Sequence, residues 1–90
     1  MTNKIIPSTK FKKDIKHFRN KPETVAKMLE IIDLLKAGKP VPAKYKPHKL
    51  EGKYHQNMEC HIENDVLLIW LDDNSGIIYL IRFGAHSQLF

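Results

Sequence analysis

The spacing of the hydrophobic residues changes near the middle of this chain, and this change limits the possible folds more than any other feature. In residues 8–38 the apolar side chains recur at intervals of three and four, as they do on one face of a helix. From Met58 onward, apolar and polar residues first alternate and then give way to a continuous apolar run over residues 66–71. Both patterns are typical of strands. The sequence therefore predicts an α+β fold in which the helices precede most of the strands.

Residues with special backbone preferences predict where the first elements begin and end. Residues 4–7 form a short edge strand that ends in a proline. Ser8 or Thr9 is placed to cap a first helix that follows this strand. A second helix has Pro22 in its first turn and stops at Gly38.

The second half of the chain predicts three strands after an extended connector. Residues 39–50 hold three prolines and four lysines, which favours a stiff, extended, basic connector. Strands are expected over residues 58–63, 66–71 and 77–83. Gly84 is expected to end the last of them. The predicted order is β-α-α-β-β-β in a single domain over residues 1–90, with two N-terminal helices packed on one face of a small, mostly antiparallel sheet.

The composition argues against several classes of protein. Cys60 is the lone cysteine, so the chain has no internal disulfide and fits a reducing cytosol. The longest apolar run, residues 66–71, is far shorter than the roughly 20 residues that a membrane-spanning helix needs. The N-terminal residues also lack the apolar stretch of a secretory signal. We therefore expect a cytoplasmic protein that does not enter the membrane.

The charge is distributed unevenly between the two halves of the chain. The formal net charge is +5, with 13 Lys and Arg against 4 Asp and Glu in residues 1–50, and 2 against 6 in residues 51–90. A basic half of this kind is typical of a protein that binds a polyanion, most often a nucleic acid. A solvated lysine-rich surface gives the same pattern. The predominance of lysine over arginine favours contacts with a phosphate backbone over the reading of bases.

Histidines are the main candidates for chemistry, because imidazole changes its charge near neutral pH. The chain has five of them: His17, His48, His55, His61 and His86. We expect His17 and His55 to be exposed surface residues without a catalytic role. His61 and Asp65 are close in sequence, but the end of a strand and a turn separate them, and no second cysteine or helical His-x-x-x-His pair accompanies them. The sequence therefore predicts no metal site and no other cofactor.

Other common catalytic arrangements are also absent from the sequence. Cys60 has the same strand parity as Met58 and Ile62, which predicts a buried side chain rather than a nucleophile. The serines lack a Gly-x-Ser-x-Gly elbow, and the scattered glycines form no phosphate-binding loop.

Cleavage of RNA through its own 2′-hydroxyl is the metal-free reaction that these residues fit. This reaction needs a base for the 2′-hydroxyl proton, an acid for the departing 5′-oxygen and a cation for the charge on the phosphate. The histidines and Asp65 provide acid and base groups, and Arg82 provides a cation. From the residues alone, a binding module without catalysis stays an equal alternative.

Three separated motifs connect the chain with a known family. They read His48-Lys49-Leu50-Glu51-Gly52, Glu59-Cys60-His61-Ile62-Glu63-Asn64-Asp65, and Arg82-Phe83-Gly84-Ala85-His86 followed by Leu89-Phe90. With them the chain resembles the YafQ branch of the RelE/ParE superfamily of toxin–antitoxin toxins. The pattern of that branch is His-x-Leu-x-Gly, then acidic-x-His-Ile-x-x-Asp, then Arg-x-Gly-x-His-x-x-Leu-Phe. The resemblance covers nearly the whole chain, since the predicted order of elements matches as well.

The resemblance implies a ribosome-dependent endoribonuclease that cuts mRNA in the ribosomal A site. It also implies a cognate antitoxin that inactivates the toxin and through which the pair binds operator DNA. By motif position, the acid–base residues are His48, His61, Asp65 and His86, with His86 as the acid and Asp65 or His61 as the base. Arg82 matches the arginine that binds phosphate, and Phe90 matches an aromatic residue that holds the RNA.

The basic first half gains a role from this resemblance. Lys44, Lys46 and Lys49 are concentrated beside His48, and we expect them to dock on ribosomal RNA through its phosphates.

Two departures from the family pattern keep other functions open. Val66 stands where the family often has tryptophan, and Met58 stands where a basic residue is common. These changes keep open a binding-only relative without activity. A ParE-like inhibitor of gyrase is a further alternative, although it would not need the acid–base histidines.

Overall fold

The structure is a computed structural model that describes residues 2–52 and 57–90. His55 and the Lys53-Tyr54 continuation of the first motif lie outside these residues. The elements in chain order are β1 (Lys4–Pro7), α1 (Thr9–Lys16), α2 (Pro22–Lys36), the 3₁₀ helix η1 (Ala43–Tyr45), β2 (His48–Lys49), β3 (Met58–Glu63), β4 (Val66–Asp72), β5 (Ile77–Ala85) and α3 (His86–Leu89).

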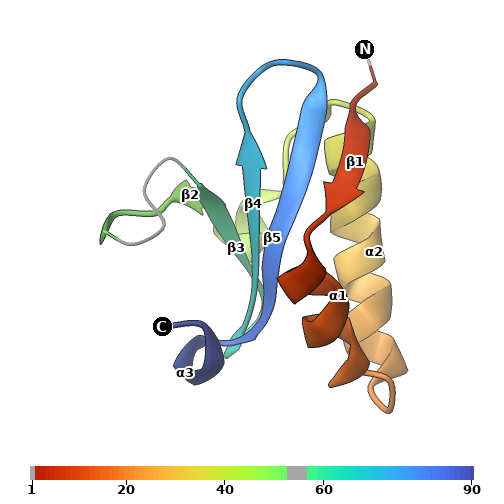
Figure 1. Cartoon of the computed structure of the whole chain (residues 1–90), viewed down its shortest axis with the longest axis vertical. Helices are drawn as coiled ribbons and strands as arrows, with labels where there is room; N and C mark the ends of the chain where they lie inside the picture. Colours follow the sequence, from red (N-terminus) through yellow and green to blue (C-terminus); the bar gives the residue numbers. More distant parts are fainter. Residues whose placement is uncertain (1, 53–56) are drawn as a thin grey trace.

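Five strands form one sheet in the spatial order β1-β5-β4-β3-β2. β1 runs parallel to β5, with Lys4 opposite Ile77, and every other neighbouring pair is antiparallel. Figure 1 shows α1 and α2 together on one side of this sheet and the short α3 on the other. The predicted α+β class, with two N-terminal helices on one face of a mostly antiparallel sheet, is therefore confirmed.

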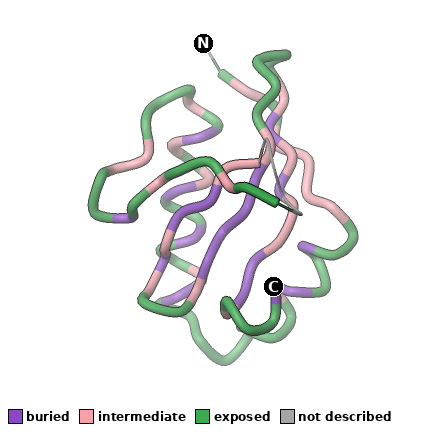
Figure 2. The backbone as a smooth tube through the Cα atoms, turned by 90° about the vertical axis from the view of Figure 1, so that its left-hand side faces the viewer, coloured by how far each residue is buried: buried purple, intermediate pink, exposed green. Residues whose placement is uncertain are grey.

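The helices and the sheet enclose the main core. Phe11 and Met28 of the two helices pack there with Cys60, Leu68 and Phe83 of the three central strands. In Figure 2 the buried positions follow these strands and the inner sides of the helices. A smaller cluster on the opposite face of the sheet joins two β4 residues with an α3 residue: Leu67, Ile69 and Leu89. This second cluster fixes α3 beside the sheet, because a four-residue helix is not stable alone.

The start of α1 and the end of α2 coincide with residues that the sequence marks. The Ser8 hydroxyl accepts a hydrogen bond from the backbone N–H of Phe11 at 3.0 Å, so Ser8 is the cap of α1. α2 ends where Gly38 takes a φ of 71°, a left-handed conformation that glycine adopts without strain. No helix in the described part of the chain is both long enough and apolar enough to cross a bilayer.

Two expectations for the second half are wrong. The basic connector is not extended throughout, because it contains the 3₁₀ helix η1, and its residues His48 and Lys49 form a further strand, β2, which pairs with Glu59 and Met58 of β3. Gly84 does not end the last strand, since β5 stays paired with β4 as far as Ala85. A Cβ atom at Gly84 would lie 3.0 Å from Oε1 of Gln88, so glycine leaves room for the Gln88 side chain of α3 beside the strand.

Candidate active site

His48 and Glu59 form a close pair where β2 meets β3. They are opposed residues of the two strands, and His48 Nε2 lies 2.7 Å from Oε2 of Glu59. The carboxylate is buried, with Glu59 only 5% exposed, whereas His48 is open to solvent. A buried carboxylate requires a polar partner, and the imidazole supplies one.

The backbone fixes the other side of the His48 ring. Nδ1 of His48 lies 2.8 Å from the carbonyl oxygen of Lys46, whose backbone is left-handed with a φ of 51°. Both ring nitrogens therefore face oxygen acceptors. The hydrogen bond to the Lys46 carbonyl needs a proton on Nδ1. The hydrogen bond to Glu59 needs a proton either on Nε2 or on the Glu59 carboxyl group. The two contacts together fix the orientation of the His48 ring.

His61 completes what we call the histidine cluster: His48, Glu59 and His61. The rings of His48 and His61 are stacked, with centroids 5.9 Å apart. One possible ligand atom from each of the three residues lies within 4.8 Å of the others. Two imidazoles and a carboxylate are ligands that zinc and copper accept, so these residues fit a divalent transition metal as well as proton transfer. From the sequence, His61 and Asp65 were the candidate metal ligands, and the set with His48 and Glu59 was not predicted.

His86 and Phe90 form a second group at the C-terminal helix. Their rings are stacked, with centroids 4.8 Å apart and planes 23° from parallel. Phe90 is 50% exposed, which leaves ring surface open to a base. His86 is tied to Asp65 by the backbone, since its N–H donates to the Asp65 carbonyl oxygen at 3.3 Å. Asp65 itself is exposed in the turn between β3 and β4.

The sheet register relates the two groups to each other. His61 lies opposite Leu67 of β4, and Leu67 lies opposite Gly84 of β5, two residues before His86. Directly opposed residues of antiparallel strands project to the same face of a sheet. Leu67 also packs with Leu89 of α3 on that face. His61 and α3 therefore share one face and one end of the sheet.

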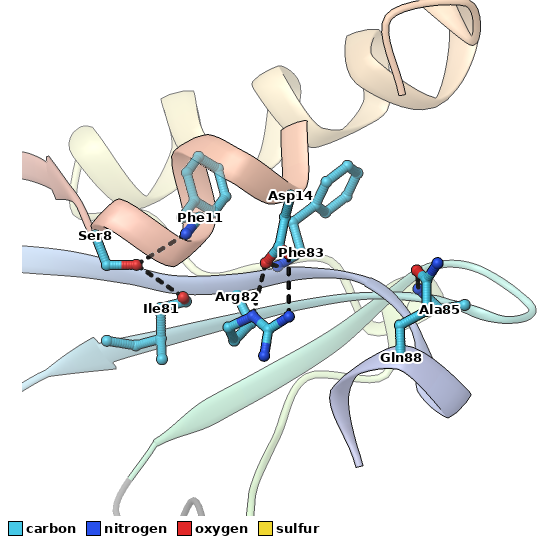
Figure 3. A network of polar contacts seen from close by, with 8 residues as sticks. All are labelled: Ser8, Phe11, Asp14, Ile81, Arg82, Phe83, Ala85 and Gln88. Atoms are coloured by element: carbon cyan, nitrogen blue, oxygen red, sulfur yellow. Dashed lines mark hydrogen bonds and ion pairs between the residues drawn. The ribbon is translucent and has the colours of Figure 1, made fainter. Parts of the chain in front are cut away.

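Arg82 is held by a carboxylate that the sequence analysis did not single out. Nε and Nη2 of Arg82 donate to Oδ2 and Oδ1 of Asp14 at 2.7 and 3.0 Å, and the Phe83 N–H donates to Oδ2 at 3.0 Å. Figure 3 shows the Asp14 carboxylate reaching from α1 to the edge of β5. β1 pairs with β5 only as far as Leu80, so Asp14 takes up a backbone donor beyond the end of that pairing. Arg82 of β5 and Glu59 of β3 lie on either side of the same β4 residue, because Ile69 is opposite both of them.

The three lysines that were expected to dock on ribosomal RNA line two different hollows. Lys44 and Lys46 line a hollow of about 460 Å³ that His61 also lines. Lys49 lines a different hollow, together with Met58 and Trp70. Lys44 and Lys46 thus lie in the hollow next to His61, whereas Lys49, although adjacent to His48 in β2, lines a hollow on another side of the sheet.

Cys60 and the two departures from the family pattern belong to the core. Cys60 is fully buried, and burial raises the pKa of its thiol to about 12, so it is not a thiolate nucleophile. Met58 and Val66 pack against the main core cluster.

Sequence reasoning missed Glu59 and Asp14 as residues of the site. Glu59 carried a signal, since it lies two residues before His61 on a strand and therefore faces the same way. Asp14 carried none, because its partner Arg82 is 68 residues away along the chain.

Comparisons with known proteins identify the family. The family model described as the bacterial toxin of a type II toxin–antitoxin system, YafQ, matches residues 3–90. The chain belongs to the YafQ family of toxins. It is 32% identical over 85 residues to the mRNA interferase toxin YafQ of Escherichia coli K12, which covers 92% of this chain and 90% of that protein.

Solved structures of bacterial toxins agree with this assignment. The E. coli DinJ–YafQ toxin–antitoxin complex contains a chain that matches with a TM-score of 0.87 at 28% identity, covering 100% of this chain and 99% of that one. A copper-bound mutant toxin from Helicobacter pylori matches with a TM-score of 0.88 at 31% identity over the full length of both chains. The resemblance drawn from the three motifs is thus confirmed at the level of the YafQ family.

Proposed function

We propose that this YafQ-family toxin is an endoribonuclease that cuts mRNA in the ribosomal A site by metal-free acid–base catalysis. The observation that carries the proposal is the histidine cluster, which shares a face and an end of the sheet with the stacked His86–Phe90 pair. Support also comes from the E. coli relative, whose name describes an mRNA interferase.

The proposed reaction divides three roles among these residues. His61 or Asp65 removes the proton of the RNA 2′-hydroxyl, and the 2′-oxygen then attacks the phosphorus. His86 gives a proton to the departing 5′-oxygen as the phosphorus–oxygen bond breaks, leaving a 2′,3′-cyclic phosphate and a 5′-hydroxyl. His48, held by Glu59 and the Lys46 carbonyl, stabilises the charge on the phosphate together with Arg82. Phe90 stacks on a base beside the cut.

The partners of the toxin follow from the same proposal. The ribosome and its mRNA are the substrate complex, which the toxin meets in the cytoplasm. Lys44, Lys46 and Lys49 contact ribosomal RNA phosphates. A cognate antitoxin inactivates the toxin, as the DinJ–YafQ complex of the relative suggests, and carries it to operator DNA.

Cell-free translation tests this function directly. Wild-type protein and the His86→Ala variant are added to purified ribosomes translating a defined message, and primer extension maps the cuts. We expect discrete cuts with the wild type and a loss of about 10²–10⁴-fold with the variant, since His86 acts as the acid. His17→Ala, a change at an exposed histidine outside the site, serves as the control and should cut normally.

The results also separate the alternatives. Absence of cuts with both proteins would indicate a binding-only relative, and inhibition of DNA supercoiling by the wild type would indicate a gyrase inhibitor. A cleavage rate that rises and then falls around neutral pH would agree with one protonated and one unprotonated catalytic group.

A further inference from the structure

Lys46 has an unusual backbone conformation directly before the first residue of the histidine cluster. Its φ and ψ are 51° and 53°, which lie in the left-handed region. Asn74 is the other non-glycine residue with a positive φ in the described part of the chain, and asparagine tolerates this conformation in turns. Lysine adopts it only at a cost, and a residue before a proline, here Pro47, ordinarily prefers an extended backbone. Strain of this kind clusters at active sites.

Contacts on both sides of Lys46 hold this conformation. Its N–H donates to the Ala43 carbonyl oxygen at 2.9 Å and so ends the 3₁₀ helix η1. Tyr45 is only 8% exposed and belongs to the main core cluster, which attaches η1 to the rest of the protein. The Lys46 carbonyl oxygen lies 2.8 Å from Nδ1 of His48. The main chain of Lys46 therefore connects an anchored turn to a ring of the histidine cluster.

The ψ angle of Lys46 determines where its carbonyl points. An extended residue before proline has a ψ of about 120–160°, so a change from 53° to this range would turn the carbonyl by about 70–110°. The oxygen would then no longer face Nδ1 of His48. Pro47 gives little freedom to compensate, because its ring fixes φ at about −65°. The contact with His48 thus depends on the left-handed conformation of Lys46.

This contact matters because one hydrogen bond does not fix an exposed imidazole. A contact between Nε2 and Glu59 alone lets the His48 ring pivot about that hydrogen bond. A second contact at Nδ1 fixes the plane of the ring, and it also fixes a proton on Nδ1 because a carbonyl oxygen can only accept. The conformation of Lys46 therefore decides both the orientation of His48 and which nitrogen carries a proton.

We propose that Lys46 is a positioning residue for His48 and acts on it through its left-handed main chain, independently of its ammonium group. The inference rests on the proposed function for the role of His48 in stabilising charge on the phosphate. Such stabilisation depends on groups that are oriented before the reaction. Loss of the contact should therefore lower kcat for message cleavage, whereas loss of an ammonium group that binds RNA should raise KM.

Four substitutions remove the same charge at Lys46 but differ in how well they tolerate a left-handed backbone. Glycine adopts it without strain, asparagine tolerates it, alanine tolerates it less, and isoleucine is strongly disfavoured because its β-carbon is branched. Lys46→Gly, Lys46→Asn, Lys46→Ala and Lys46→Ile are compared in the cleavage of ribosome-bound message, with kcat and KM measured for each. Lys36→Ile, at an exposed lysine that ends α2 outside the site, is the control.

We expect kcat to follow tolerance of the left-handed backbone. Lys46→Gly and Lys46→Asn should have similar values, Lys46→Ala a lower one, and Lys46→Ile one about tenfold below Lys46→Gly, with similar KM in all four. Lys46→Ile should have no further effect in a His48→Ala background, because both changes then remove the same contact. Lys36→Ile should cut message normally.

NMR of the free toxin tests the contact without reference to cleavage. Spectra that correlate the carbon-bound ring protons of His48 with its ring nitrogens show whether Nδ1 carries a proton. We expect a protonated Nδ1 in the wild type and in Lys46→Gly, and an unprotonated Nδ1 in Lys46→Ile at the same pH just above neutral. Chemical denaturation shows whether each variant is folded, and Lys46→Ala replaces Lys46→Ile in the comparison if the latter is not.

Equal kcat values in the four variants would overturn the inference, whether all are normal or all are reduced, because the left-handed backbone would then make no difference. A further loss in the His48→Ala background would overturn it too, since Lys46 would then act elsewhere, and so would an unchanged Nδ1 in Lys46→Ile. If the wild type cuts no message but Nδ1 differs between Lys46→Gly and Lys46→Ile as expected, the nuclease proposal fails and the positioning of His48 stands.

Discussion

Asp14 shows how one residue can connect the fold with the site. Its carboxylate accepts two hydrogen bonds from the Arg82 guanidinium and one from the backbone N–H of Phe83. The interaction is largely shielded from water, with 18% of the Arg82 side chain and 12% of the Asp14 side chain exposed. Removing one partner from such a pair leaves the other as a poorly solvated charge.

Asp14→Asn therefore tests this connection with little change in volume. We expect the free energy of unfolding to fall by about 3 kcal/mol, because the Arg82 cation loses its counter-charge and at least one of the three donors then faces an NH2 group instead of an acceptor. Message cleavage should fall in the variant even under conditions where it stays folded, since Arg82 is no longer held in place. Chemical denaturation measures the first effect. Glu30→Gln, at an exposed carboxyl of α2, is the control and should change stability by less than about 0.5 kcal/mol.

The histidine cluster can bind a metal or transfer protons, but it cannot do both at once, because both uses need the same ring nitrogens. We expect a chelator selective for transition metals, which leaves ribosomal Mg²⁺ in place, to preserve cleavage. Excess Zn²⁺ should inhibit cleavage, and the chelator should reverse the inhibition. A wild-type enzyme that the chelator inactivates and Zn²⁺ restores would contradict the metal-free mechanism.

At the scale of elements, a side-chain contact joins α2 to β3. The Thr24 hydroxyl donates to Oε1 of Glu63 at 3.0 Å, and Lys27 Nζ lies 3.2 Å from Oε2. The hydrogen bond from Lys27, followed by that from Thr24, lowers the pKa of the Glu63 carboxyl below its usual 4.5. The contact is largely exposed, so it contributes less than about 1 kcal/mol to stability.

The sign of this shift predicts how acid affects stability. Glu63 loses its proton more readily in the folded chain, so its contribution is present above the unfolded-state pKa and disappears as the pH falls through the folded-state pKa. In Glu63→Gln, the free energy of unfolding should consequently depend less on pH below about 4.5 than it does in the wild type. Denaturation curves at a series of acidic pH values measure this difference. Equal slopes in the two proteins would show that the contact makes no difference in solution.

Most elements that could be predicted from the sequence have a repeating pattern, and the exception is β1, which Pro7 ends. α1 and α2 carry apolar stripes, and β3, β4 and β5 carry alternation or an apolar run, so local spacing is sufficient to identify them. β2 and α3 have only two and four residues, and neither has a periodic pattern. β2 exists because β3 offers it an edge, and α3 because Leu89 is buried against β4. Such elements depend on contacts between distant segments and cannot be deduced from local sequence.

At the scale of the whole molecule, the site too is predictable from local sequence only in part. The motifs identified His48, His61, Asp65, Arg82 and His86 as residue types in order, and a family resemblance gave them roles. How they are grouped depends on strand register, which puts Glu59 beside His48 and brings α3 to the face of His61. The roles themselves stay predictions until the variants are measured.

The division of the lysines gives a prediction for the binding of the whole molecule to the ribosome. Lys44 and Lys46 line the hollow beside His61, and Lys49 does not. Reversing the first two to glutamate should weaken ribosome binding and reduce its dependence on salt, because fewer counterions are released. Lys49→Glu alone should have a smaller effect. Sedimentation with ribosomes at several salt concentrations measures both, and a larger effect of Lys49→Glu would reverse this assignment.

The parallel pairing of β1 with β5 also determines when the protein can assemble. A chain leaves the ribosome N-terminus first, so Lys4 emerges long before Ile77, the residue it lies opposite in the sheet. Both helices are likewise made before the strand that carries Phe83 of their shared core. β1 and the helices must therefore wait, exposed, until β5 has been synthesised. The ribosome that makes this protein is thus not exposed to a folded toxin until β5 has been translated.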